Sequence, residues 1–196
     1  PDRRFNFNFS SSKIVQLPQT SFKEHTIPGS IEFEDFDNGG ASVAYADATF
    51  GNSGGAYRPN ESVDIEAKTG GGYNLLDVNV NEWLEYTVTV KSLGKFTASI
   101  DYAAIGAGNE AILYMDGSDV SQTISFPSTG DLNTWSNKTV DVQLTTGTHV
   151  LKFFIKNGAS ELKLDKMVFT EKEVVYPGDG IGLNKTFWKA TAPGTW

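Results

Sequence analysis

Two glutamates near the start of the chain have a spacing that suits chemistry by paired carboxylates. Glu32 and Glu34, in the stretch SIEFEDFD, lie at positions i and i+2. If this stretch is a β-strand, both side chains project from one face, because side chains alternate along a strand. Such a pair can serve as the acid and base of a glycosidase or share a hard cation such as calcium. A solvated strand face gives the same pattern. Since nothing nearby supplies a substrate groove, calcium is the better functional interpretation.

The stretch GNSGG, residues 51–55, raises the question of a nucleophilic serine, because it differs by one residue from the GDSGG loop of chymotrypsin-like proteases. Ser53 would then need a histidine base, an aspartate that orients it, and oxyanion donors. The chain has only two histidines, His25 and His149, and His25 precedes Ser53 too closely for a barrel to fit between them. We therefore predict a glycine-rich turn.

Two tryptophans are candidates for sugar contacts. They are Trp83, in NEWLEY, and Trp135, in LNTWSN. Aromatic rings bind sugars by covering the apolar face of a pyranose, while neighbouring polar groups hydrogen-bond to the hydroxyls. Packing in the core is the alternative role for each ring. Phosphate-binding loops, zinc motifs and dinucleotide fingerprints are absent from the sequence.

Composition excludes several function classes. The net charge of −8 over 196 residues argues against nucleic-acid partners, because phosphate binding needs a basic surface. No run of 18 apolar residues occurs, so we expect no membrane span. The absence of cysteine removes disulfides and thiolate metal sites. No signal peptide is recognised, and we expect the opening PDRR to be cut from a longer protein.

Alternation of apolar and polar residues predicts an all-β protein. About nine short strands follow one another, separated by Gly, Asp, Asn, Ser or Pro turns, which indicates a β-sandwich or barrel. The expected strands are 4–10, 31–35, 81–90, 95–105, 110–115, 122–126, 138–144, 149–155 and 162–169. We divide the chain into an N-terminal extension (1–29), a sandwich (30–171), and a linker with the truncated start of a following module (172–196).

An ordered set of fragments resembles a known family. The set is SIEFEDFDNGG, VAYAD, GNSGGAYRPNESVDIE, GGYN, NEWLEYTVTV, DGSDV, FPSTG, NTW, GTHVLKF and LKLDKMVF. In this order the chain is similar to family 6 carbohydrate-binding modules over about residues 30–171. The resemblance implies a β-sandwich of jelly-roll type. It also implies a non-catalytic domain attached to a secreted polysaccharide-degrading enzyme. The tail, GDGIGLNKTFWKATAPGTW, loosely resembles the opening strand of a protective-antigen-type β-domain.

The resemblance also implies a structural calcium ion. In the family this ion is held by glutamates of the opening strand and an aspartate of the closing strand. Glu32 and Glu34 match the first pair, and Asp165 in LKLDKMVF matches the last. A backbone carbonyl from the turn near Arg58 would complete the site. The ion would thus join the two ends of the domain.

Family members commonly bind glycans at the loop end of the sandwich, between two aromatic side chains. In this chain Asp77 stands at one aromatic position and Leu132 at the other, while Lys163 replaces a usual asparagine. Usual end-on glycan recognition is therefore in question. The candidate loop-end residues are Tyr73, Asn74, Asp77, Asp131, Leu132 and Lys163.

Some family members use a second site on the concave face of one sheet. Trp83 matches the tryptophan of that site, Lys156 the lysine, and Asp64 or Glu66 an acidic position. Since Trp83 also belongs to the family framework, packing remains an alternative role for it.

We therefore expect a secreted or cell-surface bacterial module. It would bind a polysaccharide or oligosaccharide and keep a covalently linked catalytic domain near that glycan. The alternative is a spacer sandwich that has lost sugar binding, which the replaced loop-end residues favour.

Overall fold

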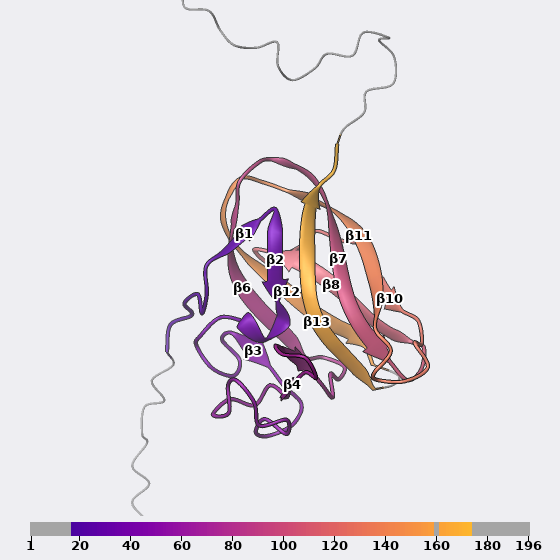
Figure 1. The fold of residues 1–196 in the computed structure, drawn as a ribbon. Helices are drawn as coiled ribbons and strands as arrows, with labels where there is room; N and C mark the ends of the chain where they lie inside the picture. Colours follow the sequence, from indigo (N-terminus) through magenta and orange to yellow (C-terminus); the bar gives the residue numbers. More distant parts are fainter. Residues whose placement is uncertain (1–16, 159–160, 174–196) are drawn as a thin grey trace, which may run out of the picture.

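Two β-sheets pack face to face in the protein (Figure 1). The structure, a computed structural model, describes residues 17–158 and 161–173. The predicted strand at 4–10 lies outside these ranges, and so does the predicted module after residue 173. Among the described residues, no helix is long and apolar enough to cross a membrane.

The first sheet is built around three long antiparallel strands, β6, β12 and β8. A short N-terminal strand, β1, pairs in parallel with β6 at one edge. The strands in spatial order are β1 (His25–Ile27), β6 (Trp83–Val90), β12 (Gly147–Asn157), β8 (Asn109–Met115) and β10 (Ile124–Phe126), with β3 (Tyr45–Ala46) on β6 and β9 (Ser118–Asp119) on β8.

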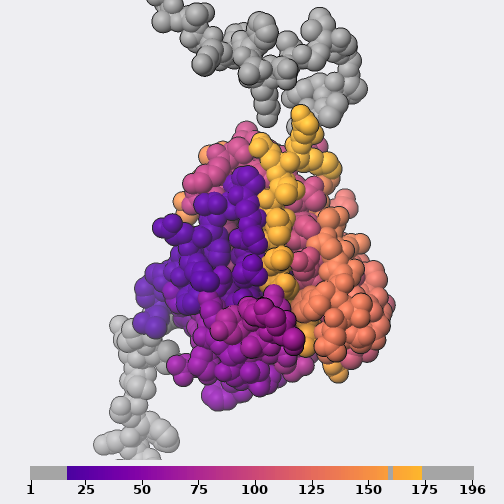
Figure 2. Space-filling model, in the orientation of Figure 1, coloured from indigo at the N-terminus to yellow at the C-terminus, as the bar shows by residue number. Residues whose placement is uncertain are grey.

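The second sheet is centred on the last strand of the sandwich, β13. In spatial order its strands are β11 (Ser136–Leu144), β7 (Gly94–Ala104), β13 (Leu162–Glu171), β5 (Tyr73–Leu75) and β4 (Ile65–Ala67), with β2 (Gly29–Glu32) on β13. Ile31 of β2 lies opposite Met167 of β13. Figure 2 shows the indigo N-terminal segment beside the yellow β13. The opening and closing segments of the domain are therefore neighbours.

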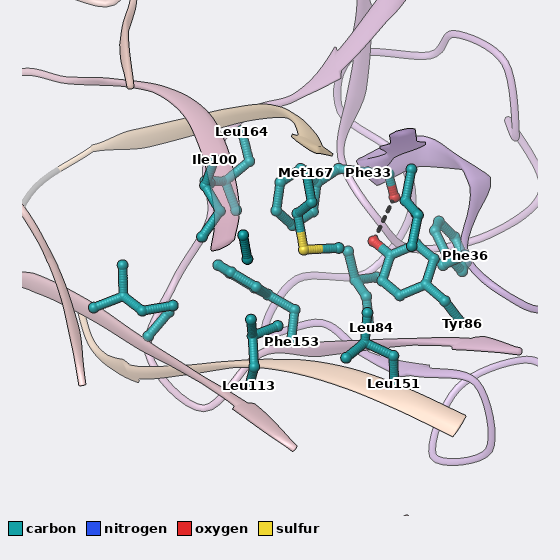
Figure 3. Close-up of a cluster of buried hydrophobic side chains, with 14 of the residues drawn as sticks. Phe33, Phe36, Leu84, Tyr86, Ile100, Leu113, Leu151, Phe153, Leu164 and Met167 are labelled. Carbon is teal, nitrogen blue, oxygen red and sulfur yellow. Dashed lines mark hydrogen bonds between the residues drawn. The ribbon is translucent and has the colours of Figure 1, made fainter. Parts of the chain in front are cut away.

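The core lies between the two sheets, and alternation determines which residues fill it. In β6 the even-numbered residues are buried, so Leu84, Tyr86 and Val88 point inward as predicted. The Phe33 and Phe153 rings meet edge to face with 4.8 Å between their centroids. The buried Tyr86 hydroxyl donates a hydrogen bond of 2.9 Å to the Phe33 carbonyl (Figure 3). This bond satisfies a hydroxyl that would otherwise be costly to bury.

The fold confirms the predicted all-β sandwich of jelly-roll type. The strongly alternating stretches 81–90, 95–105, 138–144, 149–155 and 162–169 each overlap a strand of seven or more residues. Short strands such as β1, β3 and β9 were not predicted, because two or three residues are too few for a period-two pattern.

One predicted strand is wrong at its end. β2 stops at Glu32, and Phe33–Asp35 form a 3-10 turn. Glu34 therefore does not share a strand face with Glu32. The cause is the spacing of the two fully buried rings, Phe33 and Phe36. Residues three apart project from one side of a 3-10 turn, whereas on a strand they would point to opposite faces.

The GNSGG stretch is a tight turn packed against β4, as predicted. Ser53 N donates to Asp64 Oδ1 at 2.6 Å. The two histidines are engaged elsewhere: His25 Nε2 lies 3.1 Å from the Asp35 carbonyl oxygen, and His149 Nδ1 lies 2.7 Å from Asp116 Oδ2. Because neither imidazole is bonded to Ser53, this turn has no nucleophile–base pair.

Glu82 holds two loops together at the same end of the sandwich. Its two carboxylate oxygens accept hydrogen bonds from Ala48 N at 3.0 Å and Asn79 N at 2.9 Å. Burial raises the pKa of Glu82 to about 7, against the lowering effect of these two amides and with a smaller contribution from the Asp47 charge.

We expect Gly54→Ala to destabilise the protein by about 1–3 kcal/mol, because a Cβ at this position would overlap the Ile65 carbonyl. Gly94→Ala is the matched control, since its nearest neighbouring atom would lie 3.9 Å away. Urea unfolding measures both free energies. Equal effects of the two substitutions would contradict the close packing of this turn.

The raised pKa of Glu82 predicts a pH dependence of stability. The stabilising contribution of the protonated side chain is complete below the ordinary value of 4.5 and is lost as pH rises through about 7. Glu82→Gln cannot titrate. The free energy of unfolding of this variant, minus that of the native protein, should rise by on the order of 2–3 kcal/mol between pH 4.5 and 8. Urea unfolding across this range measures the difference, and a difference that does not change with pH would contradict the raised pKa.

Candidate functional site

Three carboxylates predicted as metal ligands lie near the junction of the opening and closing segments. Glu34 is buried, and no described residue donates a hydrogen bond to its Oε2 atom. Glu32 ends β2, and Asp165 lies in β13, where it forms an ion pair with Lys68 from the turn after β4. A buried carboxylate oxygen without a donor is costly, so this position favours a cation.

The raised pKa values of Glu32 and Glu34 reflect burial first and the crowding of negative charge second. Burial raises the pKa of Glu34 to about 7, and repulsion by Asp35 and Glu32 adds to the effect. Burial also raises the pKa of Glu32, helped by the charge of Asp165. Lys68 acts in the opposite direction on both glutamates. Lys166 lowers the pKa of Glu32 more strongly, and Lys68 is the cation whose charge acts on both glutamates.

The donor chemistry of this group fits calcium, which prefers carboxylate and carbonyl oxygens. Its present geometry is not a closed site: within residues 17–158 and 161–173, no three carboxylate or imidazole groups converge closely enough to hold a metal. The Arg58 carbonyl accepts hydrogen bonds from Glu61 N and Asn52 Nδ2. Because Asp165 is already paired with Lys68, an ion here would have to displace that ammonium group.

A groove of about 450 Å³ lies beside the hairpin formed by β4 and β5, and we call it the Trp135 groove. Its principal side chains are Glu66, Asn74, Leu132, Asn133, Trp135 and Lys163. Trp135 is 38% exposed, which is high for so large an apolar ring. The groove therefore combines an accessible aromatic surface with polar groups.

Hydrogen bonds fix the floor of the Trp135 groove. Lys163 forms an ion pair with Glu66, and Asn74 Nδ2 donates to Glu66 Oε1 at 3.1 Å. Burial alone would raise the pKa of Glu66, but the Lys163 and Asn74 hydrogen bonds outweigh it and lower that pKa. The floor is thus a charge-balanced network of donors and acceptors.

The predicted loop-end residues divide among several places. Asn74, Leu132 and Lys163 line the Trp135 groove. Asp77 lines a different groove, which contains Phe50. Tyr73 packs on Tyr57, with 4.6 Å between ring centroids.

Asp131 stabilises its own turn and does not line the Trp135 groove. Its Oδ1 accepts hydrogen bonds from Asn133 N and Thr134 N, each at 2.7 Å. The site prediction omitted Trp135, although the sequence had marked this tryptophan as an aromatic candidate. Its ring, three residues after Leu132, supplies the aromatic wall of the groove.

The outer face of the first sheet carries two of the residues predicted for the second sugar site. Trp83 and Lys156 lie on the adjacent strands β6 and β12. Lys152 Nζ lies 4.0 Å from the centroid of a Trp83 ring and 2.7 Å from Glu85 Oε1. This cation–π contact occupies one face of the indole.

Asp64 and Lys156 are engaged in local hydrogen bonds. Asp64 is buried beneath the GNSGG turn, where it accepts from Ser53 N, and Lys156 Nζ donates to Thr123 Oγ1 at 3.1 Å. Together with the covered Trp83 ring, these contacts make the outer face a weaker candidate than the Trp135 groove.

Comparison with known proteins gives the same family as the sequence fragments. The family model "Carbohydrate binding module (family 6)" matches residues 55–171. A search of curated proteins found no match. Solved structures with similar folds include a family 6 module from Clostridium stercorarium in complex with cellobiose, at 16% identity and a TM-score of 0.58. The match covers 76% of this chain and 98% of that module.

Two further structures are similar in the same way. A module of Cellvibrio mixtus lichenase 5A, in complex with cellotriose, is 23% identical with a TM-score of 0.57, over 74% of this chain and 98% of that one. The C-terminal module of a Zobellia galactanivorans laminarinase is 19% identical with a TM-score of 0.58, over 73% and 98%. At these identities the structures show the shared fold. Because the family model covers more than half of the chain, the chain belongs to family 6 of the carbohydrate-binding modules, a family of non-catalytic domains.

Proposed function

We propose that this module binds a glycan in the Trp135 groove and keeps an attached polysaccharide-active enzyme close to it. The exposed Trp135 ring beside the Glu66–Lys163–Asn74 network is the observation that carries the proposal. The ring would cover the apolar face of a sugar, and the polar network would bond to its hydroxyls.

Attachment explains why such binding is useful without catalysis. A tethered module raises the effective concentration of its enzyme at the glycan surface. The cellobiose and cellotriose held by two similar modules support oligosaccharides as the ligand class. Action on an external polysaccharide requires that the protein be secreted or on the cell surface, so this localisation belongs to the proposal.

The alternative function is a spacer sandwich without sugar binding. It is favoured by Leu132, which lacks an aromatic face, and by the Lys163–Glu66 ion pair, which leaves fewer polar groups free for a ligand. The two functions differ in whether the isolated chain binds any glycan.

We propose that calcium binds between the opening segment and β13, with Glu32, Glu34 and Asp165 as its carboxylate ligands. The unpartnered Oε2 atom of Glu34 supports this assignment. The ion would balance the negative charge of these carboxylates and would hold the two segments together. Lys68 would be released from Asp165 on binding.

Trp135→Ala should weaken binding of the preferred glycan about 5- to 150-fold, since loss of a stacked ring costs on the order of 1–3 kcal/mol by analogy with base stacking. Isothermal titration with cello-, xylo- and laminari-oligosaccharides measures the affinities of the native protein and the variant. Leu93→Ala, which removes an exposed apolar side chain elsewhere, is the control. Native protein that binds no glycan would favour the spacer function, and an unaffected variant would move binding away from this groove.

Calcium should raise the melting temperature of the native protein, and a chelator should lower it, because a ligand of the folded state stabilises that state. Lys68→Met should increase the calcium affinity by removing the competing cation of Asp165. Lys172→Met is the matched control, since its partner is Asp141. Isothermal titration with calcium chloride measures both affinities. A melting temperature that does not respond to calcium would refute the metal site.

A further inference from the structure

Phe50 is the most exposed large apolar side chain among the described residues, at 102% of the reference value. A single exposed ring is common on protein surfaces and needs no explanation by itself. Its surroundings are less common, because the ring stands on a firmly held loop and borders a groove.

The backbone on both sides of Phe50 is fixed by carboxylate acceptors, of which Glu82 and Asp64 are buried. Before it, Ala48 N donates to Glu82 Oε1 at 3.0 Å, and Thr49 N donates to Asp47 Oδ1 at 2.8 Å. After it, Ser53 N donates to Asp64 Oδ1 at 2.6 Å. The loop therefore presents the ring in a set position, which lowers the entropy cost of binding.

The adjoining groove has a volume of about 380 Å³, and we call it the Phe50 groove. Its polar side chains are Thr49, Asn52, Ser53, Asp64 and Asp77. Asp77 has a positive φ of 50°, a conformation that costs energy for any residue with a Cβ. No described residue donates a hydrogen bond to its carboxylate. Asp77 thus offers free acceptor oxygens to the groove.

We infer that the Phe50 groove is a second sugar subsite, a step that rests on the proposed glycan-binding function. The Phe50 ring would cover the apolar face of a pyranose, and Asp77 would accept hydrogen bonds from its hydroxyls. Two carboxylates, Asp64 and Asp77, would repel an anionic sugar. The ligand of this subsite is therefore a neutral sugar.

The Phe50 and Trp135 grooves are built on the same hairpin. Glu66 of β4 lies opposite Asn74 of β5 at the Trp135 groove. Two residues further along each strand, Leu76 N donates to the Asp64 carbonyl at 3.0 Å, and Asp64 and Asp77 line the Phe50 groove. Residues i and i+2 of an extended chain are about 7 Å apart. One oligosaccharide chain therefore reaches both grooves, and the contribution of Phe50 grows with chain length.

The test is a titration of the ¹⁵N-labelled full chain, followed by NMR, with the mono- and tetrasaccharides of the cello, xylo and laminari series. The best-binding tetrasaccharide should shift the amide signals of Phe50, Ser53 and Asp77 as well as the Trp135 indole signal. Phe50→Ala should weaken its binding about 5- to 100-fold, by analogy with single-ring stacking. Phe50→Tyr should retain the affinity, and monosaccharide binding should be little changed.

The controls separate this inference from the proposed function. Phe50→Ala should leave the urea unfolding curve unchanged, because the ring is fully exposed. Shifts confined to the Trp135 groove, with Phe50→Ala binding like native protein, would overturn the second subsite and leave glycan binding intact. An absence of shifts with every sugar would overturn both. Loss of affinity in Leu93→Ala as well would show that the Phe50 effect is not local.

Discussion

The requirement that Phe33 and Phe36 both enter the core governs the opening of this domain. Three residues apart, they reach the same side only if the chain leaves the β conformation after Glu32. The resulting turn brings the Phe33 carbonyl to the Tyr86 hydroxyl, and so links the opening segment to the opposite sheet. It also carries Glu34 inward with an unpartnered oxygen. Packing of the two rings thus leaves Glu34 with a buried, unpartnered oxygen that a cation would satisfy. The free energy gained by burying two rings outweighs the cost of burying this carboxyl.

The loop end is held by acidic side chains that accept backbone hydrogen bonds. Glu82 joins the segments at Ala48 and Asn79, and Asp64 holds the GNSGG turn. Carboxylates suit this role because one group can satisfy several amides of irregular backbone. The loop that carries Phe50 is therefore held in place without regular secondary structure, and Asp131 does the same for the turn before Trp135. Side chains held in place in this way suit ligand binding, since less entropy is lost on binding.

Sequence patterns predicted the long strands well, because each buries one face and so alternates over many residues. β6 and β12 are examples, with alternation across most of their lengths. The prediction that Glu34 lies on a strand with Glu32 was wrong, because two glutamates at positions i and i+2 occur both in strands and at the start of turns. The groove residues were only partly predictable. Matching positions to a family pattern named Asn74 and Lys163, which line the Trp135 groove, and Asp77, which lines the Phe50 groove. It left out Trp135, because loop geometry decides where such side chains point.

Lys68 connects the carboxylate group with the Trp135 groove. Its ammonium group pairs with Asp165, its charge acts on Glu32 and Glu34, and its side chain also lines the Trp135 groove. Gly72 leaves room for this lysine, since a Cβ there would lie 3.2 Å from Lys68 Cε. A cation that takes Asp165 would therefore release an ammonium group at the edge of the groove. By linkage, a ligand that prefers the released lysine would in turn favour the bound cation. If calcium and a glycan bind as proposed, the two events would be coupled through the Lys68 side chain.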